Sequence, residues 1–262
     1  MLIKALCDYY DILSVKGSVL PAGYSKVSVH YKISLTEDGQ IDEIIDCQKK
    51  ELVQSGKKMK EKKDPVEMVM PQRTEKPGID ANIIEHRPLY IFGLNMDKDH
   101  LTPDDRTDKA KKSHIAFVKA NLDFMANLQS PIISAFRNFL LSWKPEEQTE
   151  NRWLLGLGKD YQKAGFAFCL SGEPDCLLHE DPRVKKKWEE EYAITEDYGE
   201  DVVIAQCGIT GIVGPIEKNH RKIKGVYNAN TSGSKLISFK NLSEQSYGNK
   251  QSYNSNVSVV AM

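Results

Sequence analysis

Ten residues at positions 26–35, KVSVHYKISL, alternate between apolar and polar side chains without a break. One side of this pattern carries only large apolar residues, which are Val27, Val29, Tyr31, Ile33 and Leu35. A repeat of two residues predicts a strand with one face on a core and the other, including His30, at the surface. The following TEDGQ contains Asp38-Gly39, a strong hairpin signal, and predicts a second antiparallel strand around 41–47.

Three other segments carry apolar residues at helical spacing. In residues 2–13 the spacing predicts a short N-terminal helix, which ends before Gly17. Residues 109–129 carry a longer stripe, made of Ile115, Phe117, Val118, Leu122, Phe124, Met125 and Leu128. Ser130 and Pro131 supply an N-cap and a first helical residue for the next helix. Its stripe consists of Ile132, Phe136, Phe139, Leu140 and Trp143. The two long helices are predicted to form a helical hairpin, with His114 as a hydrogen-bonded core residue.

The remaining segments complete a mixed pattern. Strands are predicted in three further places, at 89–94, 165–172 and 201–207. Asp181 and Pro182 begin a predicted helix through residue 194. Residues 49–63, KKELVQSGKKMKEKK, have little apolar periodicity and are interpreted as an exposed, mobile loop or as a flexible arm that contacts phosphate. Because the strands come in hairpin-like groups, the predicted fold class is α+β, with mixed, mainly antiparallel strands, a helical hairpin and a short N-terminal helix.

Composition limits the classes of function. The 262 residues suffice for one large domain or two small ones, and the formal net charge of -1 excludes a strong overall attraction to nucleic acid or membranes. The chain shows neither a signal peptide nor a membrane span, so a cytoplasmic protein is expected. Five cysteines without a Cys-x-x-Cys pair suit free thiols. A zinc site is conceivable but matches no standard spacing; its ligands would be Cys169, Cys176, His179 and Cys207.

Charge is concentrated locally near the C-terminal end. Between Lys218 and Lys250 there are seven lysine or arginine residues and one acidic residue, Glu244. A phosphate-binding nucleotide loop is excluded here, because Lys235 does not follow Gly233 directly and Asn228 stands in place of the first glycine. The glycine clusters elsewhere lack the dinucleotide-binding spacing, and no nucleophile elbow or metal-ligand pair is present. Nothing in these residues requires an enzyme.

The same basic stretch has the chemistry of a nucleic-acid contact. Lys222 and Lys224, two residues apart on a strand, would present both ammonium groups to neighbouring phosphates. NANTSGS at 228–234 adds amides, hydroxyls and a glycine that allows close backbone approach, with LISF at 236–239 as a supporting strand. Four aromatic residues of this stretch could stack on bases or pack in the core. They are Tyr227, Phe239, Tyr247 and Tyr253. On the residues alone, a nucleic-acid reader and a plain exposed loop both remain open.

Several stretches in order carry a family resemblance. They are LIKALCDYYDIL, VSVHYKISLTEDGQIDEIIDC, MPQRTEKPGIDANIIEHRPLYIFGL, HIAFVKANLDFM, CGITGIVGPIEKNHRKIKGV and NANTSGSKLISFKNLSEQSYGNKQSYNSNVSV. With these motifs the chain resembles the N-terminal part of the large subunit of the subtype I-C CRISPR surveillance complex, the Cascade assembly. Family members run longer and have a helical C-terminal region that is missing here. Residues 1–262 are therefore expected to be the N-terminal DNA-recognition domain, as a fragment or a naturally shortened version.

The resemblance implies binding without catalysis, and without a metal or another cofactor. The expected role is to recognise the protospacer-adjacent motif in double-stranded DNA and to help start unwinding, while guide pairing reads most of the sequence. The implied partners are target DNA, CRISPR RNA, the other Cascade subunits and a recruited helicase-nuclease, but no membrane. The predicted DNA-contacting residues are Gln72, Arg73, Asn82, Lys222, Lys224, Asn228, Asn230, Thr231, Ser232, Gly233 and Lys235.

Two other functions remain open on the sequence. The chain could be a docking module for other Cascade subunits, using its apolar stripes and the acidic run at 189–201. It could also be a metal-dependent nuclease of the same defence system. For the site residues at 222–235, the alternative is an exposed turn. For Gln72, Arg73 and Asn82, the alternative is a structural loop in which Asn82 caps an element.

Overall fold

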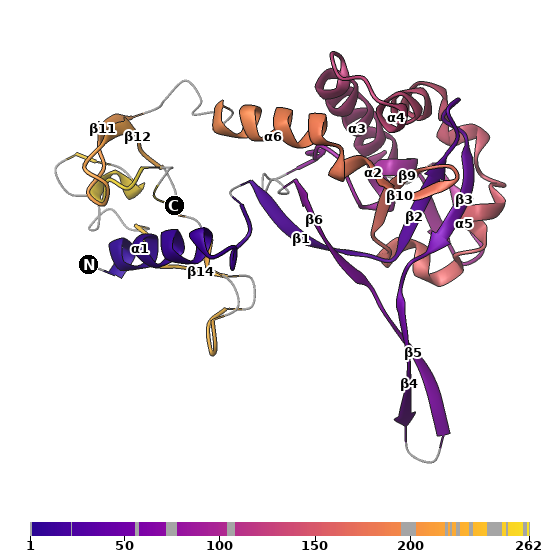
Figure 1. Ribbon diagram of the computed structural model, residues 1–262, viewed down its shortest axis with the longest axis horizontal. Helices are drawn as coiled ribbons and strands as arrows, with labels where there is room; N and C mark the ends of the chain where they lie inside the picture. Colours follow the sequence, from indigo (N-terminus) through magenta and orange to yellow (C-terminus); the bar gives the residue numbers. More distant parts are fainter. Residues whose placement is uncertain are drawn as a thin grey trace. The chain divides into compact units, whose positions relative to one another are not determined.

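The computed structural model describes most of the chain, and the ribbon is shown in Figure 1. The described residues are 2–21, 23–55, 58–71, 78–103, 108–194, 203–217, 220, 222–223, 226–230, 233–239, 248–249, 251–258 and 261. They form two compact units, which are treated separately. Leu20–Glu190 is called the central unit, and Met1–Val19 together with Glu191–Met262 is called the terminal unit.

Among its described residues, the central unit contains ten strands and most of the helices. Its strands are β1 (Tyr24–Val29), β2 (Tyr31–Leu35), β3 (Ile41–Asp46), β4 (Lys49–Ser55), β5 (Lys58–Asp64), β6 (Val66–Pro71), β7 (Asn95–Asp97), β8 (His100–Thr102), β9 (Phe166–Leu170) and β10 (Glu173–Leu177). Its helices are α2 (Pro88–Phe92), α3 (Lys109–Met125), α4 (Pro131–Ser142) and α5 (Arg152–Leu155), with short 3-10 turns at Pro145–Glu147, Gly158–Lys163 and Leu178–Glu180. A last helix, α6 (Pro182–Ile194), leads into the terminal unit.

The alternating segment at 26–35 forms strands, as predicted, but it forms two of them, and they belong to different sheets. β1 pairs with β6, and β2 lies in a four-stranded sheet. All five apolar residues of the alternation are buried, from 0% to 8% exposed. The chain breaks at His30, whose backbone N–H donates to the carbonyl of Gly165 and whose Nδ1 accepts from the Gly165 N–H at 3.0 Å. A Cβ on Gly165 would lie 2.1 Å from the Ser28 carbonyl oxygen, so this close approach requires glycine. His30 is therefore half-buried at a strand junction, and its prediction as a surface residue was wrong.

A four-stranded sheet in the order β10-β9-β2-β3 forms the centre of the unit. β2 and β3 make the predicted antiparallel hairpin, with Gly39 at a φ of 79° in its turn. β2 and β9 pair in parallel, from Tyr31 opposite Phe166 to Leu35 opposite Leu170. β1 and β6 form a separate antiparallel pair, which shares a small apolar cluster with Ala167 of β9. The mainly antiparallel α+β fold is thus confirmed, with one parallel pairing between segments distant in sequence.

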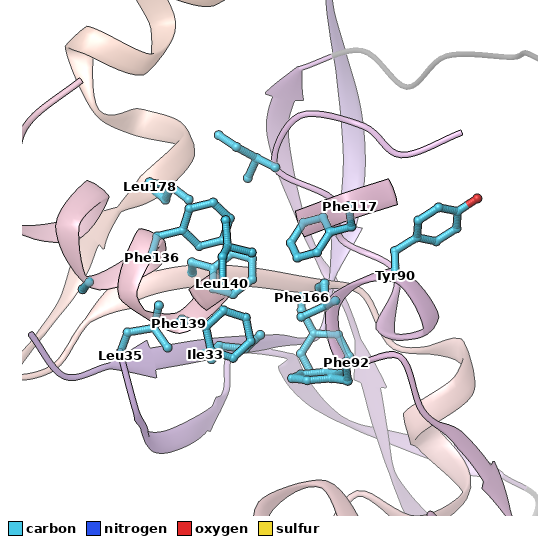
Figure 2. Close-up of a cluster of buried hydrophobic side chains, with 14 of the residues drawn as sticks. Ile33, Leu35, Tyr90, Phe92, Phe117, Phe136, Phe139, Leu140, Phe166 and Leu178 are labelled. Carbon is cyan, nitrogen blue, oxygen red and sulfur yellow. The ribbon is translucent and has the colours of Figure 1, made fainter. Parts of the chain in front are cut away.

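Aromatic side chains fill the core between the sheet and α4 (Figure 2). Phe136 meets Phe168 edge to face with ring centroids 4.7 Å apart, and Phe92 meets Phe166 at 5.3 Å. Fully burying each such ring contributes about 1.5–3 kcal/mol from removed apolar surface, before packing effects. α4 begins as predicted, since the Ser130 hydroxyl accepts from the Ile133 N–H at 3.3 Å.

α3 packs on the core with most of the predicted stripe. Phe117, Phe124 and Met125 are buried, and Val118, Leu122 and Leu128 are partly buried against the core. Ile115 was predicted wrongly, since it is 57% exposed, and the buried face instead extends over Ala110, Ser113, His114 and Asn121. Asn121 lies in that face because its side chain bonds the backbone of Ile84 and Asn82, and a buried polar group with partners is tolerated. His114 is a buried histidine whose Nδ1 lies 3.0 Å from the Tyr90 carbonyl oxygen, as predicted.

Two local predictions in this unit were wrong. The segment predicted as a strand at 89–94 contains the one-turn helix α2, because Pro88 occupies its first position and Gly93 ends it with a φ of 66°. Residues 49–63, interpreted as an exposed, mobile loop, instead form most of the β4–β5 hairpin, and the alternative of an arm that contacts phosphate stays a prediction. This hairpin extends away from the sheet in Figure 1.

The terminal unit combines both ends of the chain. It contains α1 (Leu2–Val15), β11 (Ile204–Gln206), β12 (Val213–Pro215), β13 (Lys222–Ile223), β14 (Ser234–Lys235) and a 3-10 turn at Gln251–Asn254. Cys7 of α1 donates to the Ala261 carbonyl oxygen at 3.4 Å, and the Glu217 N–H donates to the Val257 carbonyl at 3.0 Å. The predicted N-terminal helix is confirmed, with Gly17 just beyond its end. Among the described residues, no helix is both long and apolar enough to cross a membrane.

Candidate nucleic-acid interface

The predicted DNA-contacting residues divide between the two units. Five of them lie outside the described residues. These five are Gln72, Arg73, Lys224, Thr231 and Ser232. Asn82 belongs to the central unit. The remaining five come together in the terminal unit on one short hairpin, and they are Lys222, Asn228, Asn230, Gly233 and Lys235.

Two antiparallel pairs close this hairpin. Lys222 of β13 lies opposite Lys235 of β14, and Ile223 lies opposite Ser234. Both lysines are exposed, so two ammonium-bearing residues face solvent from directly paired positions. Like charges at directly paired positions repel each other. Lys235, eleven residues after Lys224, is thus the described neighbour of Lys222 across the two strands.

The loop between these strands presents polar and aromatic groups outward. A turn closed by the Ala229 N–H to the Val226 carbonyl, at 3.1 Å, places Asn228 in the left-handed region with a φ of 58°. Asparagine adopts this conformation more readily than most residues, so the exposed side-chain amide sits at the turn without major strain. Tyr227 beside it is 91% exposed. Of its two sequence interpretations, stacking or core packing, the exposure excludes packing within the described chain.

The end of the loop is held by its own backbone. Gly233 is buried, has a φ of 90°, and donates its N–H to the Asn230 carbonyl at 2.9 Å. The Asn230 N–H in turn lies 3.3 Å from the Ser234 hydroxyl oxygen. Because β14 ends at Lys235, the strand predicted at 236–239 was wrong, and residues 236–237 form a bend.

Buried groups fix the start of the hairpin within the terminal unit. His220, two residues before β13, is 1% exposed, and its Nε2 lies 3.3 Å from the Ser255 carbonyl oxygen. Nearby, the Cys207 sulfur accepts backbone N–H groups of Ser258 at 3.2 Å, Ile209 at 3.4 Å and Thr210 at 3.5 Å. Burial raises the pKa of this thiol, but the hydrogen bonds outweigh burial and lower its pKa to about 6. Through these hydrogen bonds the Cys207 sulfur ties residues 207–210 to the C-terminal segment.

Asn82 lies in a buried network of the central unit. It is 5% exposed and donates from Nδ2 to Glu85 Oε2 at 3.3 Å, while its carbonyl accepts from Asn121. Glu85, with no exposed surface, also binds the Arg87 guanidinium and two backbone N–H groups. This arrangement fits the structural alternative stated for Asn82, and a DNA contact by its side chain stays a prediction. Glu85 carried no recognisable signal in the sequence, because only the fold surrounds it with donors.

The possible zinc ligands are divided between the two units. Cys169, Cys176 and His179 belong to the central unit and Cys207 to the terminal unit. Burial lowers the pKa of His179 to about 4. Within the part of the chain that the structure describes, no three histidine, cysteine or acidic side chains gather in a way that could hold a metal ion.

Comparison with known families decides the affiliation of the chain. The family model described as CRISPR-associated protein (Cas_Csd1) matches residues 6–262, which is nearly the whole sequence. The chain belongs to the Csd1 family. This family comprises the large subunits of type I-C complexes, so the resemblance seen in the sequence is confirmed. No curated protein matches the chain. For a Csd1 protein, an exposed hairpin with paired lysines and an outward amide is the described feature most suited to nucleic acid.

Proposed function

We propose that this Csd1 protein is a non-catalytic subunit of an RNA-guided antiviral complex and recognises the protospacer-adjacent motif in duplex DNA. The observation that carries the proposal is the β13–β14 hairpin, in which Lys222 lies opposite Lys235 beneath a loop that exposes Asn228. The large subunits of the family are generally non-catalytic, which supports a binding role. In this role the chain acts with CRISPR RNA and other Cascade subunits, helps to start unwinding, and presents the site to a separate helicase-nuclease.

The hairpin separates two kinds of contact. Lys222 and Lys235 would hold phosphates and fix the register of the protein on the duplex, without reading sequence. The Asn228 amide offers a donor and an acceptor together, which is the pattern that recognises adenine in the major groove. Tyr227, exposed beside it, has an aromatic face on which an unpaired base could stack once the duplex opens.

A titration of the assembled complex against duplexes with varied motifs, at 50 and 200 mM salt, tests this proposal. Replacing both Lys222 and Lys235 by glutamine removes two phosphate contacts, so the slope of log affinity against log salt should fall by about 1.8. The parent should then lose about tenfold more affinity than the variant between the two salt concentrations. Lys111→Gln with Lys112→Gln is the matched control, because both are exposed on α3 and the charge change is equal.

Asn228→Gly tests the reading of sequence separately. Glycine keeps the left-handed backbone of the turn and removes only the amide, so folding of the loop is preserved. Discrimination between motif variants should fall by about 5- to 150-fold, since one bidentate base contact contributes about 1–3 kcal/mol. If the parent complex binds all motif variants equally, the proposed reading function is wrong.

A second function is favoured by one specific observation. α1 has no buried residue, and its apolar side chains are open to solvent, with Leu2 64%, Tyr9 58% and Val15 91% exposed. Such a helix face suits a docking role toward another Cascade subunit. Replacing Leu2 and Tyr9 by serine should then reduce co-elution with the other subunits while leaving the loop-dependent motif preference intact.

A further inference from the structure

A cavity of about 400 Å³ lies within the central unit, beside the junction of β1 and β2, and it is called the basic pocket below. The residues that line it are 25–28, 30, 86–88 and 162–165. None of them is acidic, and the five basic side chains among them are Lys26, His30, His86, Arg87 and Lys163. Both lysines are exposed, so the pocket opens to solvent. A concave site with this lining favours an anion over a cation or a purely apolar ligand.

The guanidinium of Arg87 is fixed at one wall of the basic pocket. Its Nε donates to Glu85 Oε1 at 2.8 Å, a second nitrogen donates to Glu85 Oε2, and its Cζ lies 4.0 Å from the centroid of the Tyr90 ring. Glu85 engages two of the five N–H groups of the guanidinium, so donors remain for an acceptor in the pocket. A side chain that is held in place before binding loses little conformational entropy when it binds an anion.

His30 supplies a neutral hydrogen-bond donor at a second wall. Its Nδ1 accepts from the Gly165 N–H at 3.0 Å, and its own backbone N–H donates to the Gly165 carbonyl oxygen at 2.8 Å. A ring nitrogen that accepts a hydrogen bond carries no proton, so the proton of this imidazole is on Nε2. His30 can therefore donate to an anion without a change in its own charge.

The two lysines give the pocket an excess of positive charge. Lys26 Nζ lies 3.2 Å from Glu67 Oε2, but the two side chains are 61% and 63% exposed, so this ion pair is weak and readily exchanged. In the described part of the chain, Lys163 forms no ion pair with a carboxylate. The three cations Lys26, Arg87 and Lys163 stand against two partner carboxylates, Glu67 and Glu85, which leaves a net charge of +1.

We propose that the basic pocket binds the phosphate ester of a nucleotide, either free or as one unit of a nucleic-acid strand. A guanidinium, an ammonium and an imidazole N–H all donate to phosphate oxygens, and the pocket offers all three. Its volume is within the range of about 300–1,000 Å³ for small-molecule sites and exceeds that of a phosphate alone, so a sugar or base enters with the phosphate. The inference goes beyond the proposed function, because the pocket belongs to the central unit and needs neither the β13–β14 hairpin nor the reading of a motif.

The placement of the donors favours a phosphate over a carboxylate, the other common biological anion. The donors come from three separate segments, which are β1 with His30, the residues before α2, and the 3-10 turn at Gly158–Lys163. A phosphate group is tetrahedral and presents several strong acceptor oxygens in different directions, whereas a carboxylate is planar and has two. The side of Arg87 that best matches a carboxylate, with Nε and a terminal nitrogen, is already occupied by Glu85.

Calorimetric titration of the full chain with adenosine monophosphate, a short single-stranded DNA and succinate tests the proposal. Lys163→Gln removes an exposed ammonium, and His30→Asn removes Nε2 while its Oδ1 can still accept from the Gly165 N–H. Each change should weaken binding of both nucleotide probes about tenfold, because a hydrogen bond to a charged group is lost. Lys159→Gln is the matched control, since it is exposed in the same 3-10 turn but does not line the pocket, and it should bind as the parent does.

The outcomes distinguish the sources of the phosphate. Equal affinity for the monophosphate and the DNA, lowered by both variants, assigns a free nucleotide, and tighter binding of the DNA with the same sensitivity assigns a strand. The proposal is overturned if neither nucleotide probe binds the parent, if succinate binds as tightly as the monophosphate, or if Lys163→Gln binds both nucleotide probes like the parent. Because Lys163 is exposed, its variant decides the matter even where His30→Asn fails to fold.

A separate measurement keeps this inference apart from the proposed function. Motif discrimination by the assembled complex should be the same in the parent and in Lys163→Gln. A parent that discriminates between motifs but binds no nucleotide probe in the basic pocket overturns the pocket alone. A parent that shows no motif discrimination overturns the proposed function, while nucleotide binding that depends on Lys163 and His30 still supports the pocket.

Discussion

Glu85 supplies a sharp test of how the central unit is held together. Its carboxylate has no exposed surface and accepts from Arg87 Nε at 2.8 Å, from a second Arg87 nitrogen, and from the backbone N–H groups of His86 and Arg87 at 3.1 Å each. Burial by itself raises the pKa of Glu85, but the hydrogen bonds and charge of Arg87 outweigh burial and hold the pKa below its usual range. The carboxylate therefore stays ionised in the folded protein at neutral pH.

Glu85→Ala should lower the free energy of unfolding of the central unit by about 3 kcal/mol. Breaking a buried ion pair costs about 3–5 kcal/mol, and the lower end applies because the Arg87 side chain, 25% exposed, can regain water. With a urea dependence of about 2 kcal/mol per molar, the unfolding midpoint should fall by about 1.5 M. Tryptophan fluorescence reports this unit alone, since Trp143, Trp153 and Trp188 all lie within it.

A matched control and a double mutant make this reasoning refutable. Glu67→Ala removes a carboxylate that is 63% exposed and 3.2 Å from Lys26, so it should cost less than about 1 kcal/mol. Glu85→Ala combined with Arg87→Ala should cost less than the sum of the two single changes, because each single change leaves a partner unpaired. A midpoint shift below about 0.3 M for Glu85→Ala, or strict additivity, would show that the network does not hold the fold.

Two further predictions concern backbone packing and a thiolate. Gly39→Ala would place a Cβ 2.2 Å from the backbone nitrogen of Phe139, whereas Gly172→Ala, at a similar positive φ, meets no atom within 4 Å. Gly39→Ala should therefore destabilise the central unit by about 1–3 kcal/mol more than Gly172→Ala in urea unfolding, and equal losses would refute the steric argument. The pKa of Cys207 is lowered to about 6, so the thiolate absorbance near 240 nm should rise with a midpoint near pH 6 in the parent but not in Cys207→Ser. Because the folded pKa lies below the ordinary thiol value of 9.0, the stabilisation is present at alkaline pH and is lost as pH falls through about 6; a midpoint near 9 would refute this assignment. Cys169→Ser is the control, since burial raises the pKa of Cys169 to about 11.

Local signals in the sequence predicted the elements whose causes are local. The alternation at 27–35 and the Asp38-Gly39 turn produce β1, β2 and β3, and Ser130 with Pro131 begins α4. These signals act over a few residues, through the strand period, a left-handed turn and a capping hydroxyl. α2 was missed because an apolar run of six residues has no visible period, and a proline and a glycine decide its conformation.

The sequence predicted the candidate site only in part, because local signals do not show how distant residues pair or which side chains become buried. The basic loop was evident from its composition, but the pairing of Lys222 with Lys235 depends on where a ten-residue loop closes. Residues 49–63 gave no strand signal, because hydrophobic alternation is absent from this stretch of the sequence. Asn82 has the composition of a surface contact, yet donors and acceptors from Glu85 and Asn121 hold it inside.

By itself, the sequence determined the fold class, the N-terminal helix, the helical hairpin and the membership of a CRISPR-associated family. The tertiary structure alone decided the parallel pairing of β2 with β9, the extent of the buried face of α3 and the burial of Asn82. The physical reason is distance along the chain. Periodicity and caps record interactions between near neighbours. Burial and strand pairing depend on residues that lie tens of positions apart, as for Asn82 and Asn121, or more than a hundred apart, as for β2 and β9, and the pairing of Lys222 with Lys235 depends on where a loop closes.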